Sequence, residues 1–237
     1  MGAYNISGCI GVDVGVRRLL TCCLVADNLA PAKTWCYDAG PAMQVLTRGM
    51  SGDEAIGVRE IRVAKDTLFM QYHAAAKEIV HVAETYHCKI AMESPPKPGS
   101  FPSPWVQVGA MFVRDDPKGT PSVPGAVLAL LPLQALFDDL VFLCRRAGLE
   151  EPLSVDAPGT SHTCARCLKE DWKGRNGDEF HCQWCHYVTD ADNNAAHIIG
   201  IRGWSTHLSH GGQGPAVVIN HRLADPGALD PLGLPAP

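Results

Sequence analysis

Four cysteines in two closely spaced pairs are the residues of this sequence best suited to bind a metal ion. Cys164 and Cys167 form the first Cys-x-x-Cys pair, fourteen residues follow, and Cys182 and Cys185 form the second. A two-residue spacer turns both sulfurs of a pair the same way, so the two pairs offer one tetrahedral site. Because four thiolates close the coordination sphere, the pattern predicts a structural zinc ion. Iron also suits four sulfurs, and four unrelated thiols are the remaining alternative.

Carboxylates at three separated places form a second candidate metal site. Asp13 ends a predicted strand, Glu93 directly follows a later strand, and Asp190 and Asp192 precede the last helix. Carboxylates brought together cannot all stay ionised without a cation, and hard oxygen ligands prefer Mg²⁺ or Mn²⁺. Two such ions could clamp the attacking and leaving oxygens of a phosphodiester during hydrolysis. Taken singly, each acid also has an ordinary interpretation, as a turn cap, a strand-end charge or a helix N-cap.

Alternating strands and helices must position these groups. The sequence predicts strands at 6–13, 19–26 and 33–38, joined by tight turns into an antiparallel meander. A long helix at 53–86 follows, for which Ser51 and Glu54 would form a capping box. A strand at 88–92, a helix at 133–147 and a strand at 153–155 come before the cysteines, and a helix rich in small residues comes after them. If the first and fourth strands are neighbours in a mixed sheet, Asp13 and Glu93 lie side by side.

The overall composition limits the classes of function. Hydrophobic residues make up 46% of the 237 residues, which is enough for a globular core. The net charge of −5 disfavours a protein that binds nucleic acid by charge alone, since such proteins usually carry a basic surface. The sequence shows neither an apolar run of about 18 residues for a membrane span nor a signal peptide. The ten cysteines are therefore expected in a reducing cytoplasm.

The order of the motifs resembles the RuvC-like nuclease half of TnpB-type, transposon-encoded RNA-guided endonucleases and of the related type V CRISPR effectors. The resemblance covers roughly residues 5 to 202 and is most specific in the cysteine region and the helix after it. The matching segments are Gly11-Val12-Asp13-Val14-Gly15, Met92-Glu93-Ser94-Pro95, the two cysteine pairs, and Asp190-Ala191-Asp192-Asn193-Asn194-Ala195-Ala196. Carried over motif by motif, the catalytic triad of the family corresponds to Asp13, Glu93 and Asp192. Asp192 is preferred to Asp190 because of its place before the Asn-Ala-Ala sequence.

The resemblance implies an α/β, RNase H-like (RuvC-like) fold: a mixed sheet flanked by helices, with an inserted zinc ribbon. The expected organisation is a nuclease core at 1–159, a ribbon at 160–188, the last core helix at 189–203 and a flexible tail at 204–237. A proline- and glycine-rich loop is expected at 94–125. The implied activity is cleavage of DNA with Mg²⁺ or Mn²⁺ by a two-metal mechanism, directed by a guide RNA. Family members also carry an N-terminal guide- and target-binding half, which we expect a separate protein to supply.

Few basic residues are available to hold nucleic acid. Between residues 160 and 202, five Lys and Arg face six Asp and Glu, so we expect a weak grip on DNA or RNA. Trp172 and Trp184 could stack on bases, but ribbon aromatics usually pack against the metal-binding turns, and we expect that here. The candidate nucleic-acid contacts are Arg17, Arg18, Arg166, Lys173 and Arg175.

Two alternatives to a guided nuclease stay open. The acidic net charge and the lack of a guide-binding half favour a catalytically weak or inactive, transposon-derived zinc-ribbon protein that binds nucleic acid without cutting it. The other alternative is a structure-specific nuclease that acts on branched DNA as a dimer, like resolvases of the same fold.

Overall fold

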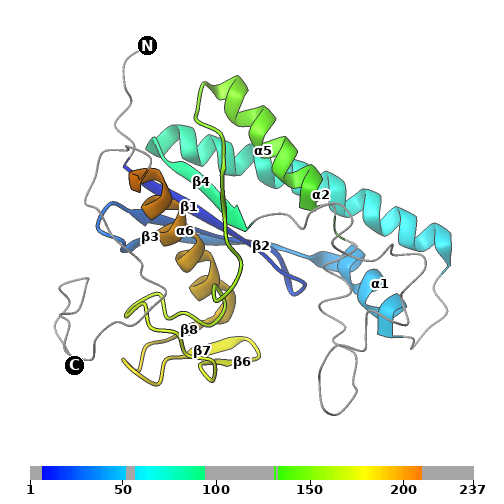
Figure 1. Cartoon of the computed structure of the whole chain (residues 1–237). Helices are drawn as coiled ribbons and strands as arrows, with labels where there is room; N and C mark the ends of the chain where they lie inside the picture. The colour runs from blue at the N-terminus through cyan, green and yellow to red at the C-terminus, as the bar shows by residue number, and fades with distance from the viewer. Residues whose placement is uncertain (1–6, 52–56, 94–130, 132, 210–237) are drawn as a thin grey trace.

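The main sheet has five strands, and its first three form an antiparallel meander (Figure 1). The computed structural model describes residues 7–51, 57–93, 131 and 133–209. Turns of a few residues join the three strands, so each can only fold back beside the last. The strands of this sheet are β1 (Gly8–Val14), β2 (Arg18–Ala26), β3 (Pro31–Asp38), β4 (Lys89–Glu93) and β5 (Leu153–Val155).

Two further strands join the meander in parallel. β4 pairs with β1, with Gly11 opposite Ala91 and Val12 opposite Met92, and β5 pairs with the other edge of β4. The strand order is therefore β3-β2-β1-β4-β5. This confirms the expected neighbourhood of the first and fourth strands, and with it the mixed sheet.

Three helices cover one face of the sheet. They are α1 (Gly40–Ser51), α2 (Val58–Tyr86) and α5 (Leu133–Ala147). Ile10 and Val12 of β1 and Leu20 of β2 point to this face and pack with the buried residues of the helices, among them Leu46, Leu68, Tyr72, Ile79, Leu136 and Leu140. Helix α1 was not predicted from the sequence. Its signal is Gly40-Pro41, because proline is favoured in the first turn of a helix.

In the described part of the chain, one helix, α6 (Ala191–Ser209), covers the opposite face (Figure 1). The helix backbone lies very close to the sheet, because glycines without side chains form the contact. A Cβ atom on Gly11 of β1 would lie 2.0 Å from the Ala196 carbonyl oxygen and 2.2 Å from the Gly200 nitrogen. A Cβ on Gly203 would lie 2.3 Å from the Cβ of Ala91. The small residues of α6 therefore set its depth on the sheet, and through it the place of Asp192.

Some predicted boundaries differ from those observed. In the described residues, α2 begins at Val58, where the Gly57 N–H donates to Glu60 Oε2 at 3.1 Å, and Ser51 is the last residue of α1. The predicted capping box pairs Ser51 with Glu54, which lies outside the described residues. Helix α6 runs past residue 203 to Ser209, and the expected tail begins too early, since Trp204 is fully buried against the sheet. The predicted loop at 94–125 and residues 210–237 of the tail lie outside the described residues.

No helix among the described residues combines the length and apolar character needed to cross a membrane.

Candidate active site and zinc ribbon

The four cysteines of the two pairs converge on one point. Among the described residues they are the group of possible metal ligands whose ligand atoms all lie within 4.8 Å of one another. The Sγ atoms of Cys164 and Cys185 are 3.6 Å apart, as are those of Cys167 and Cys182. A tetrahedron with Zn–S bonds of about 2.3 Å has edges of about 3.8 Å, so these sulfurs fit a zinc ion. The separation is far too long for a disulfide, for which it is about 2.05 Å.

Each cysteine pair sits in a turn of the same shape. The Cys164 N–H donates to the Lys169 carbonyl at 2.9 Å, and the Cys182 N–H donates to the Tyr187 carbonyl at 2.9 Å. Each turn closes with a residue in the left-handed region, Leu168 (φ 59°) and His186 (φ 56°). The hydrogen bond from the Cys164 thiol lowers the pKa of Cys167, which favours a thiolate in the cluster. The predicted structural zinc site is compatible with this geometry.

A small antiparallel sheet completes the ribbon. Its strands are β6 (Arg175–Asn176), β7 (Glu179–His181) and β8 (Val188–Asp190). Phe180 is fully buried and packs with Cys164, Cys182 and Ala191. β8 runs directly into α6, so the ribbon fixes the first residues of that helix (Figure 1).

Asn194 ties the first cysteine turn to α6. Its Oδ1 accepts a hydrogen bond from the Ala165 N–H at 2.9 Å, and its Nδ2 donates to the Thr163 carbonyl at 2.7 Å. Asn194 is 1% exposed, so neither backbone group has water as a substitute partner. No role was predicted for Asn194, although its place in the Asn-Ala-Ala sequence would have indicated one.

Replacing Asn194 with alanine is expected to loosen the ribbon from α6. Two buried backbone groups would lose their partners, which costs about 2–6 kcal/mol of unfolding free energy at roughly 1–3 kcal/mol per group. Thermal and urea unfolding would measure the loss. The matched control is Asn193→Ala, since the Asn193 Oδ1 makes a long contact of 3.4 Å with Arg18 and the side chain is half-buried. A loss at Asn194 no larger than that of the control would contradict the role of this bridge.

The strand pattern brings Asp13 and Glu93 to the face that α6 covers. Cys9 of β1 and Ala91 of β4 pack against α6, and residues two apart on a strand share a face. Asp13 and Glu93 therefore point the same way as those residues. The β1–β4 register, with Val12 opposite Met92, places the two acids at the next position along. They lie at the carboxyl ends of neighbouring parallel strands, near the start of α6.

Burial and neighbouring acids both act on the carboxyl group of Asp13. Burial raises the pKa of Asp13 well above its ordinary value, and the charges of Glu93, Asp192 and Asp190 raise it further. Burial also raises the pKa of Glu93, while the hydrogen bond from Thr160 and the charge of Arg202 lower it. Such a group of acids favours either a proton or a cation. The oxygen donors of this set suit Mg²⁺ or Mn²⁺.

Two residues that were not predicted act on Glu93, Thr160 through a hydrogen bond and Arg202 through its charge. The Thr160 hydroxyl donates to Glu93 Oε1 at 2.5 Å and also lies 2.9 Å from the Ala157 carbonyl. Arg202 of α6 is 8% exposed and donates to the carbonyl oxygens of Asp156 and Pro158 at 2.6 and 2.9 Å. The position of Thr160 directly before the ribbon is the sequence feature that would have marked it as a site residue. Nothing in the local sequence marks Arg202.

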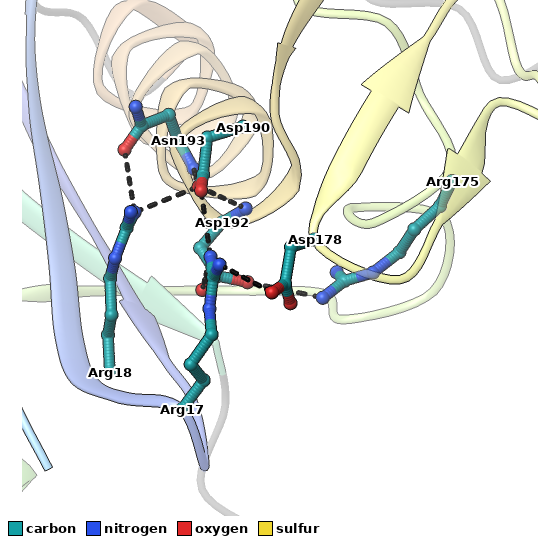
Figure 2. Close-up of polar contacts among 7 residues, drawn as sticks. All are labelled: Arg17, Arg18, Arg175, Asp178, Asp190, Asp192 and Asn193. Atoms are coloured by element: carbon teal, nitrogen blue, oxygen red, sulfur yellow. Dashed lines mark hydrogen bonds and ion pairs between the residues drawn. The ribbon is translucent and has the colours of Figure 1, made fainter.

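Arginines surround the start of α6 (Figure 2). Arg17 Nη2 lies 3.0 Å from Asp192 Oδ2, and Arg175 Nη2 lies 3.1 Å from Asp192 Oδ1. Arg17 also pairs with Asp190 at 2.7 Å and with Asp178 at 2.8 Å. Arg18 pairs with Asp190 at 2.9 Å. The three arginines, predicted as nucleic-acid contacts, are thus engaged by acids of the ribbon and of α6.

Asp190 and Asp192 have different places in this cluster. Asp190 Oδ1 accepts the backbone N–H of Asp192 at 3.0 Å and that of Asn193 at 3.1 Å, so Asp190 is the N-cap of α6. Burial opposes its ionisation, but hydrogen bonds from Arg17 and Asn193 together lower the pKa of Asp190. The capping interpretation, considered for both acids, therefore holds for Asp190. Asp192 is the second residue of α6, in its first turn, with its side chain 9% exposed.

The remaining predicted contacts lie on the ribbon. Arg166 is half-buried and Lys173 is exposed. The expected packing of Trp172 and Trp184 against the metal-binding turns is partial. Both are largely exposed, at 67% and 61%, but Trp184 Nε1 donates to the Glu170 carbonyl at 3.2 Å, beside the first cysteine turn. Phe180 is the aromatic residue buried beside the cysteines. Trp172 stacks on His162 with ring centroids 4.4 Å apart, and Lys169 lies 5.2 Å from the ring centre of Trp184.

Comparison with known proteins agrees with this arrangement. Residues 140–199 match the family model described as "Cas12f1-like, TNB domain", which covers the C-terminal part of α5, β5, the ribbon and the first part of α6. Among solved structures, the chain is similar to Cas12f1 in the cryo-EM structure of a Cas12f1–sgRNA–target DNA complex, with 19% identity and a TM-score of 0.51. That similarity covers 84% of this chain and 50% of the Cas12f1 chain, so this chain spans half the length of that relative. No curated protein matches the chain.

The predicted resemblance to TnpB-type and type V effectors is confirmed by these two matches, and the predicted α/β fold class with a zinc ribbon is confirmed as well.

Proposed function

We propose that this chain is the catalytic half of an RNA-guided endonuclease that hydrolyses DNA phosphodiesters with Mg²⁺ or Mn²⁺ by a two-metal mechanism. The proposal is supported by the position of Asp13 and Glu93 at the carboxyl ends of neighbouring parallel strands, and by the pKa of Asp13, which burial raises and the charges of Glu93 and Asp192 raise further. Asp13, Glu93 and Asp192 would hold the ions. Bound there, divalent ions supply charge stabilisation for the phosphate and a more acidic water.

The residues of the chain have separate tasks in this proposal. Thr160 and Arg202 orient and partly neutralise Glu93, and Asp190 caps α6 so that Asp192 is presented from the first turn. The ribbon positions that turn through β8 and Asn194. The organisation proposed is a core at 1–159, a zinc ribbon at 160–188 and a last core helix, α6, that starts at Ala191.

DNA is the proposed substrate and a guide RNA the proposed partner. The support is the similarity to Cas12f1, whose solved structure is a complex with a single guide RNA and target DNA. On this chain, Arg17, Arg18, Arg166, Lys173 and Arg175 are the proposed phosphate contacts. The exposed faces of Trp172 and Trp184, with Lys169 beside the latter, are available to stack on bases of a single strand. Guide and target binding by further domains, which another protein could supply, is part of the same proposal.

A cleavage assay tests the function. The purified full chain is incubated with Mn²⁺ and a labelled single-stranded DNA, beside Asp13→Asn, Glu93→Gln and Asp192→Asn. Each substitution removes one carboxylate charge at nearly constant shape, and the expected loss of cleavage is at least about 100-fold. The matched control is Glu179→Gln, which changes the same charge on an exposed residue of β7 and should cleave like the unmodified chain.

The alternative function is nucleic-acid binding without cleavage. It is favoured by the engagement of both Asp192 oxygens by Arg17 and Arg175 and by the two exposed tryptophans. Binding of the same DNA without cleavage, or cleavage that survives all three substitutions, would reject catalysis by this chain and favour the binding protein.

A further inference from the structure

We propose that Arg17 occupies a metal-binding oxygen of Asp192 in the metal-free protein, so that binding of a divalent cation requires Arg17 to leave. The inference deepens the proposed function and rests on it in one respect, namely that Asp192 is a ligand of the catalytic cation. It concerns the regulation of that site by a residue of the turn between β1 and β2.

The contacts around Asp192 carry the proposal. Both of its carboxylate oxygens already have a cationic partner, Oδ2 from Arg17 at 3.0 Å and Oδ1 from Arg175 at 3.1 Å (Figure 2). The side chain of Asp192 is 9% exposed, so solvent screens these charges little. A bound Mg²⁺ would approach a carboxylate oxygen to about 2.1 Å. A guanidinium nitrogen on the same oxygen would then face the ion at short range, and two cations so close repel each other.

Arg17 keeps other ion-pair partners when it leaves Asp192. Its Nη1 pairs with Asp178 at 2.8 Å and its Nη2 pairs with Asp190 at 2.7 Å, so it can release Asp192 and keep two acidic partners. Asp178 is 66% exposed and Arg17 is 39% exposed, so this side of the cluster faces solvent. Arg17 released in this way stands at the rim of the carboxylate site, where the phosphate of a DNA strand would meet it. The same residue is therefore a competitor of the cation in the free protein and a phosphate contact in the complex.

Arg18 provides the contrast within the chain. It pairs with Asp190 Oδ1 at 2.9 Å and contacts Asn193 Oδ1 at 3.4 Å, on the far side of the N-cap from Asp192. Removal of Arg18 changes the net charge by the same amount as removal of Arg17. It leaves the arginine on Asp192 Oδ2 in place, which makes it a matched control.

Mn²⁺ affinity of the full chain without DNA, measured by the paramagnetic resonance of free Mn²⁺, tests the inference. Arg17→Gln is expected to bind Mn²⁺ about tenfold more tightly than the unmodified chain, because a like charge beside the ion is gone. Arg18→Gln should gain less than about threefold, since its charge lies farther from the ion. Equal Mn²⁺ affinity of the two variants would overturn the inference.

Three further variants make every outcome decisive. Asp13→Asn and Asp192→Asn should weaken Mn²⁺ binding, and if neither does, the proposed function fails whatever Arg17→Gln shows. If both weaken it and Arg17→Gln binds no more tightly than Arg18→Gln, only the present inference fails. Zinc content reports whether Arg17→Gln is folded. If it is not, Arg17→Lys decides, because a single ammonium group cannot serve Asp178 and Asp192 together. Its Mn²⁺ affinity should exceed that of the unmodified chain, and an equal or weaker affinity would count against the inference.

Discussion

Replacing Cys164 with serine is expected to remove zinc from the protein, from one ion per chain to none, and to unfold the ribbon. Cys164 is fully buried, and its sulfur lies 3.6 Å from that of Cys185, so no other group can take its place in the tetrahedron. Zinc binding contributes about 10–16 kcal/mol in small zinc-finger peptides. The strands of the ribbon have two or three residues each and one buried aromatic side chain, Phe180, and cannot replace that contribution.

The five-stranded sheet should survive this loss. Its two hydrophobic clusters, one under α2 and α5 and one under α6, are built from residues outside the cysteine cluster except for Ala165 and Leu168. Limited proteolysis should therefore cut within 160–188 first, while metal analysis counts the zinc. Cys36→Ser is the matched control, because Cys36 is an exposed cysteine outside the cluster and should keep its zinc and its protease resistance. Retention of a full complement of zinc by the Cys164 variant would reject the ligand assignment.

The sheet and the four cysteines could be predicted because local sequence rules govern them. Short turns force β1, β2 and β3 into a meander, and the Cys-x-x-Cys spacing forces each pair of sulfurs to one side. The adjacency of Asp13 and Glu93 needed one further assumption, a parallel pairing of β1 with β4, which the structure confirms. All of these features follow from residues that are close in sequence or from one strand pairing.

The surroundings of the acids could not be predicted, because they depend on side chains that meet only after folding. Arg17 reaches Asp192 across 175 residues, and Thr160 reaches Glu93 across 67. No periodicity or spacing in the sequence encodes such pairs. The same holds for the tryptophans of the ribbon. Their exposure depends on Phe180 already filling the space beside the cysteines.

Replacing Gly11 with alanine is expected to destabilise the protein by about 3 kcal/mol or more, at the upper end of the cost of overpacking a core. The added methyl group would lie 2.0 Å from the Ala196 carbonyl oxygen and 2.2 Å from the Gly200 nitrogen. Both are backbone atoms, so no side chain can rotate out of the way and α6 must shift as a whole. Urea unfolding would measure the loss, or the variant would fail to accumulate as folded protein.

The distance of α6 from the sheet also sets the position of Asp192. A small displacement of α6 should therefore weaken metal binding before it measurably lowers the unfolding free energy. Asp192 lies one turn before Ala196 on α6, and Asp13 lies two residues after Gly11 on β1. The contact between Gly11 and Ala196 therefore fixes the separation of the two acids. A shift of α6 would weaken Mn²⁺ binding even where the chain still folds. Gly57→Ala is the matched control, because a Cβ there would lie 3.9 Å from its nearest neighbour, Glu60 Oε2, and the backbone is extended. That variant should change the unfolding free energy by less than about 1 kcal/mol. Equal losses at Gly11 and Gly57 would show that the close contact between β1 and α6 does not set the position of Asp192.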